Sequence, residues 1–215
     1  MVGRRRYGRS AGVALLELVS MTFWLAGCGS TLGDPGPCRT YASAYTEMSP
    51  MGIPVNVTCT HAENAGGFDR SCTGGVPTVE HWASRADFID EAAAVGIIRL
   101  ATFTSRSSDT TTYEYDSQRR LQHMESSPPG LDDTFDAWDD LGRPLHRSSH
   151  VAYCPGGYDV TITYGDHTIT YDAPAEDLCP QHTVHVFDAD GIATTVESAS
   201  GVFSYVTTDR ATVCR

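Results

Sequence analysis

The stretch Tyr158-Asp-Val-Thr-Ile-Thr-Tyr-Gly-Asp-His-Thr-Ile-Thr-Tyr171 decides the fold class of this chain. Two runs in which apolar or aromatic residues alternate with polar ones flank Gly165-Asp166, and this arrangement is typical of a β-hairpin. Because successive side chains of a strand point to opposite faces, each run offers one face to a core and one to solvent. The stretch therefore predicts two antiparallel strands joined by a tight turn.

The sequence on either side of this stretch also predicts strands separated by turns. Residues 182–187 and 192–196, joined by Asp188-Ala-Asp-Gly191, predict a second hairpin, and residues 201–206 begin a last strand. Nearer the N-terminus, 55–59 and 97–104 read as strands, while the glycine-rich segment 61–77 reads as a loop. Residues 84–95 predict the helix, with Ser84 as its N-cap and Gly96 at its end. The expected fold is mostly β, built from antiparallel hairpins with one short helix.

The N-terminus has the parts of an export signal. Residues 1–10 hold four arginines and no acid, an apolar run follows over 11–25, and the segment ends at Leu25-Ala26-Gly27-Cys28. The apolar run is shorter than the roughly 20 residues of a transmembrane helix. Leu-Ala-Gly-Cys resembles the lipobox of bacterial lipoproteins, which implies removal of residues 1–27 and lipidation of Cys28. The alternative is a buried amphipathic helix with an unrelated cysteine.

The lipoprotein resemblance implies a location for the protein. Two or three acyl chains on Cys28 would bind the membrane firmly, because each buried methylene contributes about 0.8 kcal/mol. Gly29, next to the cysteine, favours the outer membrane over retention in the inner one. Residues 28–37, rich in Gly, Ser and Pro, form a flexible tether. We therefore expect a protein of the cell envelope whose partner is the membrane, through its lipid anchor, on the periplasmic or surface side.

Six further cysteines remain once Cys28 is set aside: Cys38, Cys59, Cys72, Cys154, Cys179 and Cys214. An even number in an exported protein predicts three disulfides, and Cys154 with Cys179 is the pairing we expect first. A metal site is less favoured, because no two cysteines have the CxxC spacing of zinc ligands. The histidines suggest no metal site either, since His182 and His185 would point to opposite faces of a strand.

Charge excludes one class of partner. The chain carries a net charge of −12, and loss of four arginines and one glutamate with residues 1–27 changes it to −15. Such acidity disfavours nucleic acid, whose phosphates require clustered cations. The acidic turn Asp188-Ala-Asp190-Gly191 superficially resembles a calcium loop but lacks the later glutamate of an EF-hand, so weak Ca²⁺ binding is the most that it predicts.

Two segments in the second half of the chain resemble each other. Tyr113-Glu-Tyr115-Asp116 continues to Leu121, and Trp138-Asp139-Asp-Leu-Gly142-Arg143 follows 23 residues later. Both resemble the YD repeat of Rhs and YD-repeat proteins, with Arg119 at the glycine position of the first unit. The resemblance implies β-hairpins in which Asp binds turn amides and Gly adopts a positive φ. Ordinary hairpins with Tyr-Asp turns are the alternative.

The sequence indicates an organisation but no reaction. Residues 38–110 form an N-terminal, cysteine-containing α+β part, and residues 111–215 form a β-hairpin region with the YD-like repeats. No Gly-x-Ser-x-Gly or phosphate-binding loop is present. The leading hypothesis is a non-catalytic binding or structural role, with an envelope polysaccharide or another envelope protein as partner. The alternative is a small envelope hydrolase that uses Asp139 and Asp140.

Overall fold

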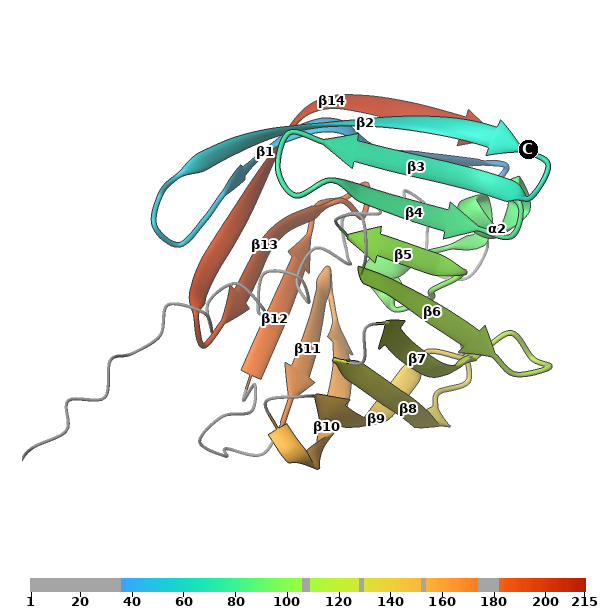
Figure 1. The fold of residues 1–215 in the computed structure, drawn as a ribbon, viewed down its shortest axis with the longest axis vertical. Helices are drawn as coiled ribbons and strands as arrows, with labels where there is room; N and C mark the ends of the chain where they lie inside the picture. Colours follow the sequence, from blue (N-terminus) through green and yellow to red (C-terminus); the bar gives the residue numbers. More distant parts are fainter. Residues whose placement is uncertain (1–35, 106–108, 128–129, 152–153, 174–181) are drawn as a thin grey trace, which may run out of the picture.

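The strands of this protein form one antiparallel sheet that closes on itself (Figure 1). The computed structural model describes residues 36–105, 109–127, 130–151, 154–173 and 182–215. The expected signal segment, Cys28, most of the tether and Cys179 therefore lie outside the described residues. The strands are β1 Cys38–Met48, β2 Pro54–Asn64, β3 Gly67–Thr73, β4 Thr78–Trp82, β5 Thr102–Ser105, β6 Asp109–Tyr115, β7 Leu121–Ser127, β8 Leu131–Trp138, β9 Pro144–Val151, β10 Cys154–Gly165, β11 Thr168–Asp172, β12 His182–Phe187, β13 Ala193–Ser198 and β14 Gly201–Cys214.

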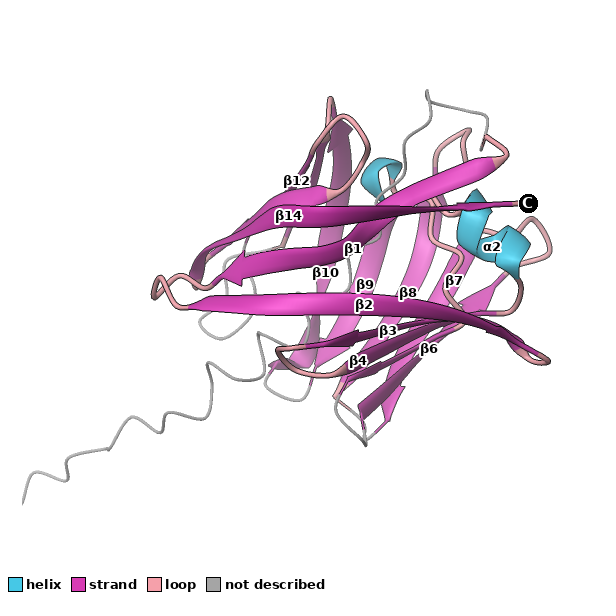
Figure 2. Cartoon of the chain, turned by 90° about the horizontal axis from the view of Figure 1, so that it is seen from above, coloured by secondary structure: helices cyan, strands magenta, loops and turns pink. Residues whose placement is uncertain are grey.

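Each strand pairs with its neighbours in sequence, and β1 pairs with β14 to close the sheet. The register of the closing pair runs from Cys38 opposite Cys214 to Met48 opposite Ser204. In such a meander, successive connections alternate between two ends of the closed sheet. One end, which we call the α2 end because it holds the helix, contains the connections β4–β5, β6–β7, β8–β9, β10–β11 and β12–β13. The connections β1–β2, β3–β4 and β13–β14 share the other, which we call the Met51 end (Figures 1 and 2).

An aromatic cluster fills the α2 end. The short helix α2, Arg85–Asp90, buries Phe88 and Ile89. The Phe88 ring centroid lies 4.5 Å from that of Phe68 and 4.8 Å from that of Trp82. These three aromatic side chains are almost wholly buried. The helix is therefore held by its packing onto the interior of the sheet, because six residues are too few to be stable alone.

The mostly β fold with antiparallel hairpins and one short helix is confirmed. The hairpin 158–171 is the pair β10 and β11, with Thr161 opposite Asp172 and Gly165 opposite Thr168. Its turn is Asp166-His167, one residue later than expected, and His167 has a φ of 57°. The hairpin 182–196 is the pair β12 and β13, and the last strand continues to Cys214.

Three local expectations were wrong. Segment 61–77 is not a loop, because β2 continues to Asn64 and β3 spans Gly67–Thr73, so that the glycines form only the turns beside these strands. The helix ends at Asp90, although Ser84 Oγ caps it by accepting the Asp87 amide; the chain becomes extended at Glu91, and the 3₁₀ turn η2, Ala93–Val95, follows. The strand expected at 97–104 begins only at Thr102.

Disulfides join strands at directly opposed residues. Cys38 is bonded to Cys214 across the closing pair of strands, and Cys59 is bonded to Cys72 across β2 and β3. Cys154 is also disulfide-bonded. Its expected partner, Cys179, lies outside the described residues, so that pairing stays a prediction.

Candidate functional site

The two segments expected to be repeats form turns with the same hydrogen bonds. Asp116 Oδ1 accepts the amides of Gln118 and Arg120 at 2.8 and 2.9 Å, and its Oδ2 accepts Arg120 Nε at 2.7 Å. The residue before Arg120, Arg119, has a φ of 63°. One carboxylate thus satisfies two turn amides and fixes the side chain of an arginine four residues later.

The Asp139 turn repeats this arrangement. Asp139 Oδ1 accepts the amides of Leu141 and Arg143, both at 3.0 Å, and its Oδ2 accepts Arg143 Nε at 2.6 Å. Gly142 has a φ of 75°, as expected from the sequence. Burial alone would raise the pKa of Asp139, but the hydrogen bonds from Arg143 outweigh it and lower that pKa. In Asp116 the same amide and guanidinium bonds lower the pKa.

A third turn, at Asp188, has the same hydrogen bonds to backbone amides, but the arginine that pairs with its aspartate comes from another strand. Asp188 Oδ1 accepts the amides of Asp190 and Ile192 at 2.9 Å each, and Gly191 has a φ of 74°. Because position 192 is an isoleucine, Asp188 pairs instead with Arg210 of β14, at 2.8 Å. Arg210 also contacts Asp190. The two carboxylates of the suggested calcium loop therefore both face a guanidinium.

The turns are linked by aromatic side chains. Tyr115, Trp138 and Tyr164 each donate a hydrogen bond to a backbone carbonyl of the preceding hairpin, and we call these three residues the aromatic ladder. Tyr115 Oη donates to Leu100 O at 2.7 Å, Trp138 Nε1 to Leu121 O at 3.0 Å, and Tyr164 Oη to Pro144 O at 2.6 Å.

Arginines from the turns lie over two of these rings. The Arg120 guanidinium carbon lies 4.4 Å from the Trp138 ring centroid, and that of Arg143 lies 4.3 Å from the Tyr164 ring centroid. Each guanidinium thus combines an ion pair within its turn and a cation–π contact to the next strand pair. Tyr113, the remaining expected repeat residue, packs on the main core, where burial raises its pKa.

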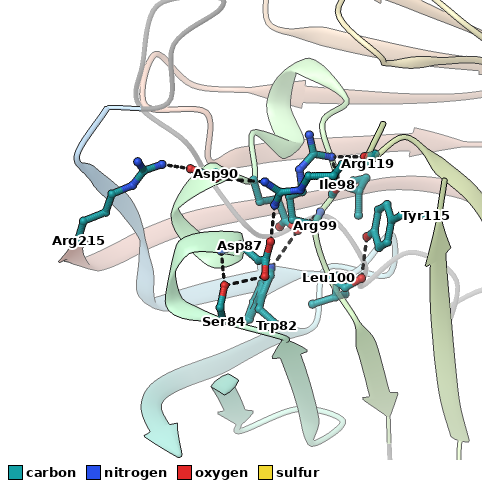
Figure 3. Close-up of polar contacts among 11 residues, drawn as sticks. Trp82, Ser84, Asp87, Asp90, Ile98, Arg99, Leu100, Tyr115, Arg119 and Arg215 are labelled. Atoms are coloured by element: carbon teal, nitrogen blue, oxygen red, sulfur yellow. Dashed lines mark hydrogen bonds and ion pairs between the residues drawn. The ribbon is translucent and has the colours of Figure 1, made fainter. Parts of the chain in front are cut away.

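A charged cluster lies around α2, next to the first YD-like turn (Figure 3). Arg119 pairs with Asp87 and lies 3.6 Å from Asp90, which also pairs with Arg215. Arg99 Nη1 donates to the carbonyls of Ile98 and Arg119 at 2.8 and 2.9 Å (Figure 3). Burial, and then the charge of Arg119, lowers the pKa of Arg99. These contacts join the first YD-like turn to the helix.

Buried ion pairs line the inside of the sheet. Arg39 pairs with Glu91 at 3.2 Å, Arg70 with Glu80 at 2.9 Å, and Arg147 with Asp133 at 2.9 Å. Glu91 also accepts Trp82 Nε1 at 3.0 Å. Buried charges require such partners, because removing an ion from water is costly unless an opposite charge and hydrogen bonds compensate.

Two ionisable groups in this interior have pKa values shifted mainly by burial. Burial raises the pKa of Asp133, against the opposing charge of Arg147 and the hydroxyl of Ser149, which is directly opposite in the register. Burial, followed by the charge of Arg147, lowers the pKa of His185 to about 3. The ring of His185 lies 5.2 Å from that of Tyr171.

The aspartates of this region, which the hydrolase alternative would use, do not lie together as a catalytic pair. Asp133 faces the interior and pairs with Arg147, whereas its strand neighbour Asp132 faces outward. Asp139 is engaged by its own turn, and Asp140 follows it as an exposed turn residue. Asp136 lies on β8 and pairs with His146.

Histidine–carboxylate pairs connect neighbouring strands at the surface. His81 pairs with Asp69 at 2.5 Å, His123 with Asp132 at 3.0 Å, His146 with Asp136 at 2.6 Å, and His182 with Asp172 at 2.6 Å. No group of three or more His, Cys, Asp or Glu side chains within the described ranges could hold a metal ion.

No protein-family model matches the sequence, and no curated protein matches it. In the part of the chain that the structure describes, no helix is long and apolar enough to cross a bilayer.

Sequence reasoning named Arg143 as a repeat residue, but it missed the side-chain bond of each turn arginine to its aspartate and the role of Tyr164. Arg120 and Arg143 both stand four residues after the turn aspartate, so the spacing Asp-x-x-x-Arg could have indicated the side-chain bond. Tyr164 carries no such signal. Its contact with Pro144 joins residues 20 apart and depends on the pairing of β9 with β10.

Proposed function

We propose that this chain is an envelope lipoprotein, anchored through Cys28, whose closed sheet has a non-catalytic binding or structural role. The proposal rests on one observation, which is that hydrogen bonds within its own turn occupy both carboxylate oxygens of Asp139. Both of its oxygens accept hydrogen bonds from Leu141 or Arg143, and its lowered pKa keeps it ionised. A carboxylate held in this way is a poor general acid, because such an acid requires a raised pKa and an open approach to substrate.

The YD-like turns support a scaffold role in this proposal. Three turns built on Asp116, Asp139 and Asp188 share one hydrogen-bonding pattern and lie at one end of the sheet. Each of the three aspartates is paired with an arginine, from its own turn or from β14, so we assign these turns the role of fixing strand register. In this proposal, the envelope partner binds to the outer faces of the strands that these turns connect.

The outer surface of β7 to β12 suits a polar partner such as an envelope polysaccharide. His146 lies between Asp136 at 2.6 Å and Asp159 at 3.7 Å, and Ser148 Oγ donates to Asp159 at 2.9 Å. His182 and Asp172 continue the polar surface across β11 and β12. Such a surface offers both donors and acceptors to sugar hydroxyls or to the polar surface of another envelope protein.

Co-sedimentation with purified insoluble envelope polysaccharide tests this proposal, using full-length protein extracted from membranes in mild detergent. We expect the wild-type protein to sediment with the polysaccharide, and Asp159→Asn with His146→Gln to weaken sedimentation at least five-fold. Glu63→Gln is the matched control, because Glu63 is also an exposed, ion-paired side chain and pairs with Arg85 at the α2 end, away from this surface. Equal binding by all variants would remove the surface from consideration, and release of new reducing ends would favour the hydrolase instead.

A further inference from the structure

The most exposed aliphatic side chains of the described residues gather at one place. Met51 is 80% exposed, Val206 59%, Ile53 55% and Val202 50%. Along β14, Val202 and Val206 alternate with the buried Phe203 and Tyr205, so they face outward. We call Met51, Ile53, Val202 and Val206 the apolar patch.

The sheet brings the members of the apolar patch together. Val206 is opposite Thr46, and Ser204 is opposite Met48, the last residue of β1. The outward-facing side chains at the start of β14 therefore lie beside the β1–β2 turn. At that turn, Pro50 lies so close to Gly201 that an added Cβ on the glycine would come within 2.7 Å of Pro50 Cβ. The β1–β2 tip and the start of β14 therefore lie side by side at the Met51 end (Figure 2).

The two ends of the sheet differ in chemistry. The α2 end carries the turns of Asp116, Asp139 and Asp188 and the charged cluster around α2. The Met51 end carries the apolar patch, and Val76 of the β3–β4 turn adds another exposed aliphatic side chain there. An exposed apolar surface of this kind at projecting loops is typical of contact with a partner or a membrane.

The length of chain before β1 favours a membrane as the occupant. Residues 28–37 can span at most about 33–36 Å when fully extended. The tether joins the sheet at Cys38, and the eleven residues of β1 cover about 36 Å between that point and the apolar patch. A lipid on Cys28 would thus keep the patch within reach of the same bilayer when β1 and β14 lie along the membrane surface.

Charge favours a neutral lipid surface over an anionic one. Glu197 is directly opposite Val202 and is exposed beside the patch. Burial of aliphatic side chains at the boundary of headgroups and acyl chains requires no cation, unlike attraction to anionic lipids. We infer that the apolar patch inserts its side chains into the zwitterionic surface of the bilayer to which Cys28 is anchored, an inference that rests on the proposed lipoprotein function.

Quenching by brominated lipid tests this inference on the full-length acylated protein. Met51→Trp and Val202→Trp each place a reporter in the patch, and Leu141→Trp is the matched control, because Leu141 is 49% exposed at the α2 end. Each protein is reconstituted into phosphatidylcholine vesicles with brominated acyl chains, and the wild-type signal from Trp82 and Trp138 is subtracted. We expect at least twice the fractional quenching for both patch reporters as for the control, with no increase when half of the lipid is phosphatidylglycerol.

Fatty-acid labelling in the same preparations separates the inference from the proposed function. An acylated protein with quenched patch reporters supports both. An acylated protein whose patch reporters are quenched no more than Leu141→Trp overturns the inference and leaves the lipoprotein proposal intact, and a doubled mass in detergent would then assign the patch to a second copy. A protein that carries no acyl chain overturns both.

Discussion

The indole of Trp138 is held between Arg120 and Leu121 of the preceding hairpin: the Arg120 guanidinium lies 4.4 Å from its ring centroid, and its Nε1 donates to Leu121 O at 3.0 Å. The same pair of contacts recurs one hairpin later, where Arg143 and Pro144 hold Tyr164. A repeated hydrogen bond and cation–π contact thus lock successive hairpins in register, independently of the backbone ladder.

Trp138→Ala should therefore destabilise the fold by about 3–5 kcal/mol, because it removes a large aromatic side chain that packs on the core. Trp138→Phe keeps a ring under Arg120 and loses the Nε1 hydrogen bond, so it should cost only about 1 kcal/mol. Asp136→Ala should cost less than about 1 kcal/mol, since it removes an exposed pair with His146. Denaturant unfolding of the three variants measures this order. A Trp138→Ala variant that is as stable as the wild type but no longer binds the envelope polysaccharide would identify Trp138 as a ligand contact and contradict the repeat interpretation.

Gly142→Ala should destabilise the protein by about 1–2 kcal/mol, because its φ of 75° is unfavourable for a residue with a Cβ. Gly191→Ala should behave alike, since Gly191 occupies the same place in the Asp188 turn with a φ of 74°. Gly156→Ala is the control, because nothing lies within 4 Å of its Cβ position and its φ is ordinary. Thermal unfolding would contradict equivalence of the turns if only one of the two turn variants lost stability.

His123 should stabilise the protein in acid. The hydrogen bond that His123 donates to Asp132, together with the charges of Asp132 and Glu114, raises the pKa of His123. Its contribution is therefore complete below the unfolded value of about 6.5 and is lost as the pH rises through the higher folded value. Compared with the wild type, His123→Gln should be less stable at pH 5.5 and equally stable at pH 9. Urea unfolding at the two pH values measures the difference, and an equal loss at both would show that the pair is not ionic.

His185 should have the opposite effect. Burial lowers its pKa to about 3, so below pH 6.5 the unfolded chain binds a proton that the folded protein does not. Stability then falls as the pH falls from 6.5 to about 3, by at most about 1.4 kcal/mol per pH unit. His185→Phe keeps a ring beside Tyr171 and removes this dependence. The slope of unfolding free energy against pH between 6.5 and 4 should become shallower, and an unchanged slope would place the proton uptake elsewhere.

Cys28→Ser should leave an uncleaved precursor that incorporates no fatty acid. The thiol at position 28 is the group on which the lipobox resemblance depends, and serine cannot replace it as the acyl acceptor. Metabolic labelling with a fatty-acid probe, followed by electrophoresis of membrane fractions, measures both effects. A labelled Cys28→Ser protein would end the lipoprotein proposal.

The sequence by itself determined the elements whose causes are local. Alternation over residues 158–171 predicted β10 and β11, and Ser84 marked the start of α2. Gly142 required a positive φ because of the turn that follows Asp139. These features depend on residues within a few positions of one another, so a short stretch of sequence carries the whole signal.

Only the tertiary structure decided the closure of the sheet and the place of each charge. Cys38 and Cys214 are 176 residues apart, and no local pattern brings β1 beside β14. Arg210 pairs with Asp188 because β14 passes that turn, and Asp133 is buried beside Arg147 while Asp132 is exposed because strand register assigns neighbours to opposite faces. Pairing between distant strands is a property of the whole closed sheet, and it therefore leaves no mark in the residues around any one position.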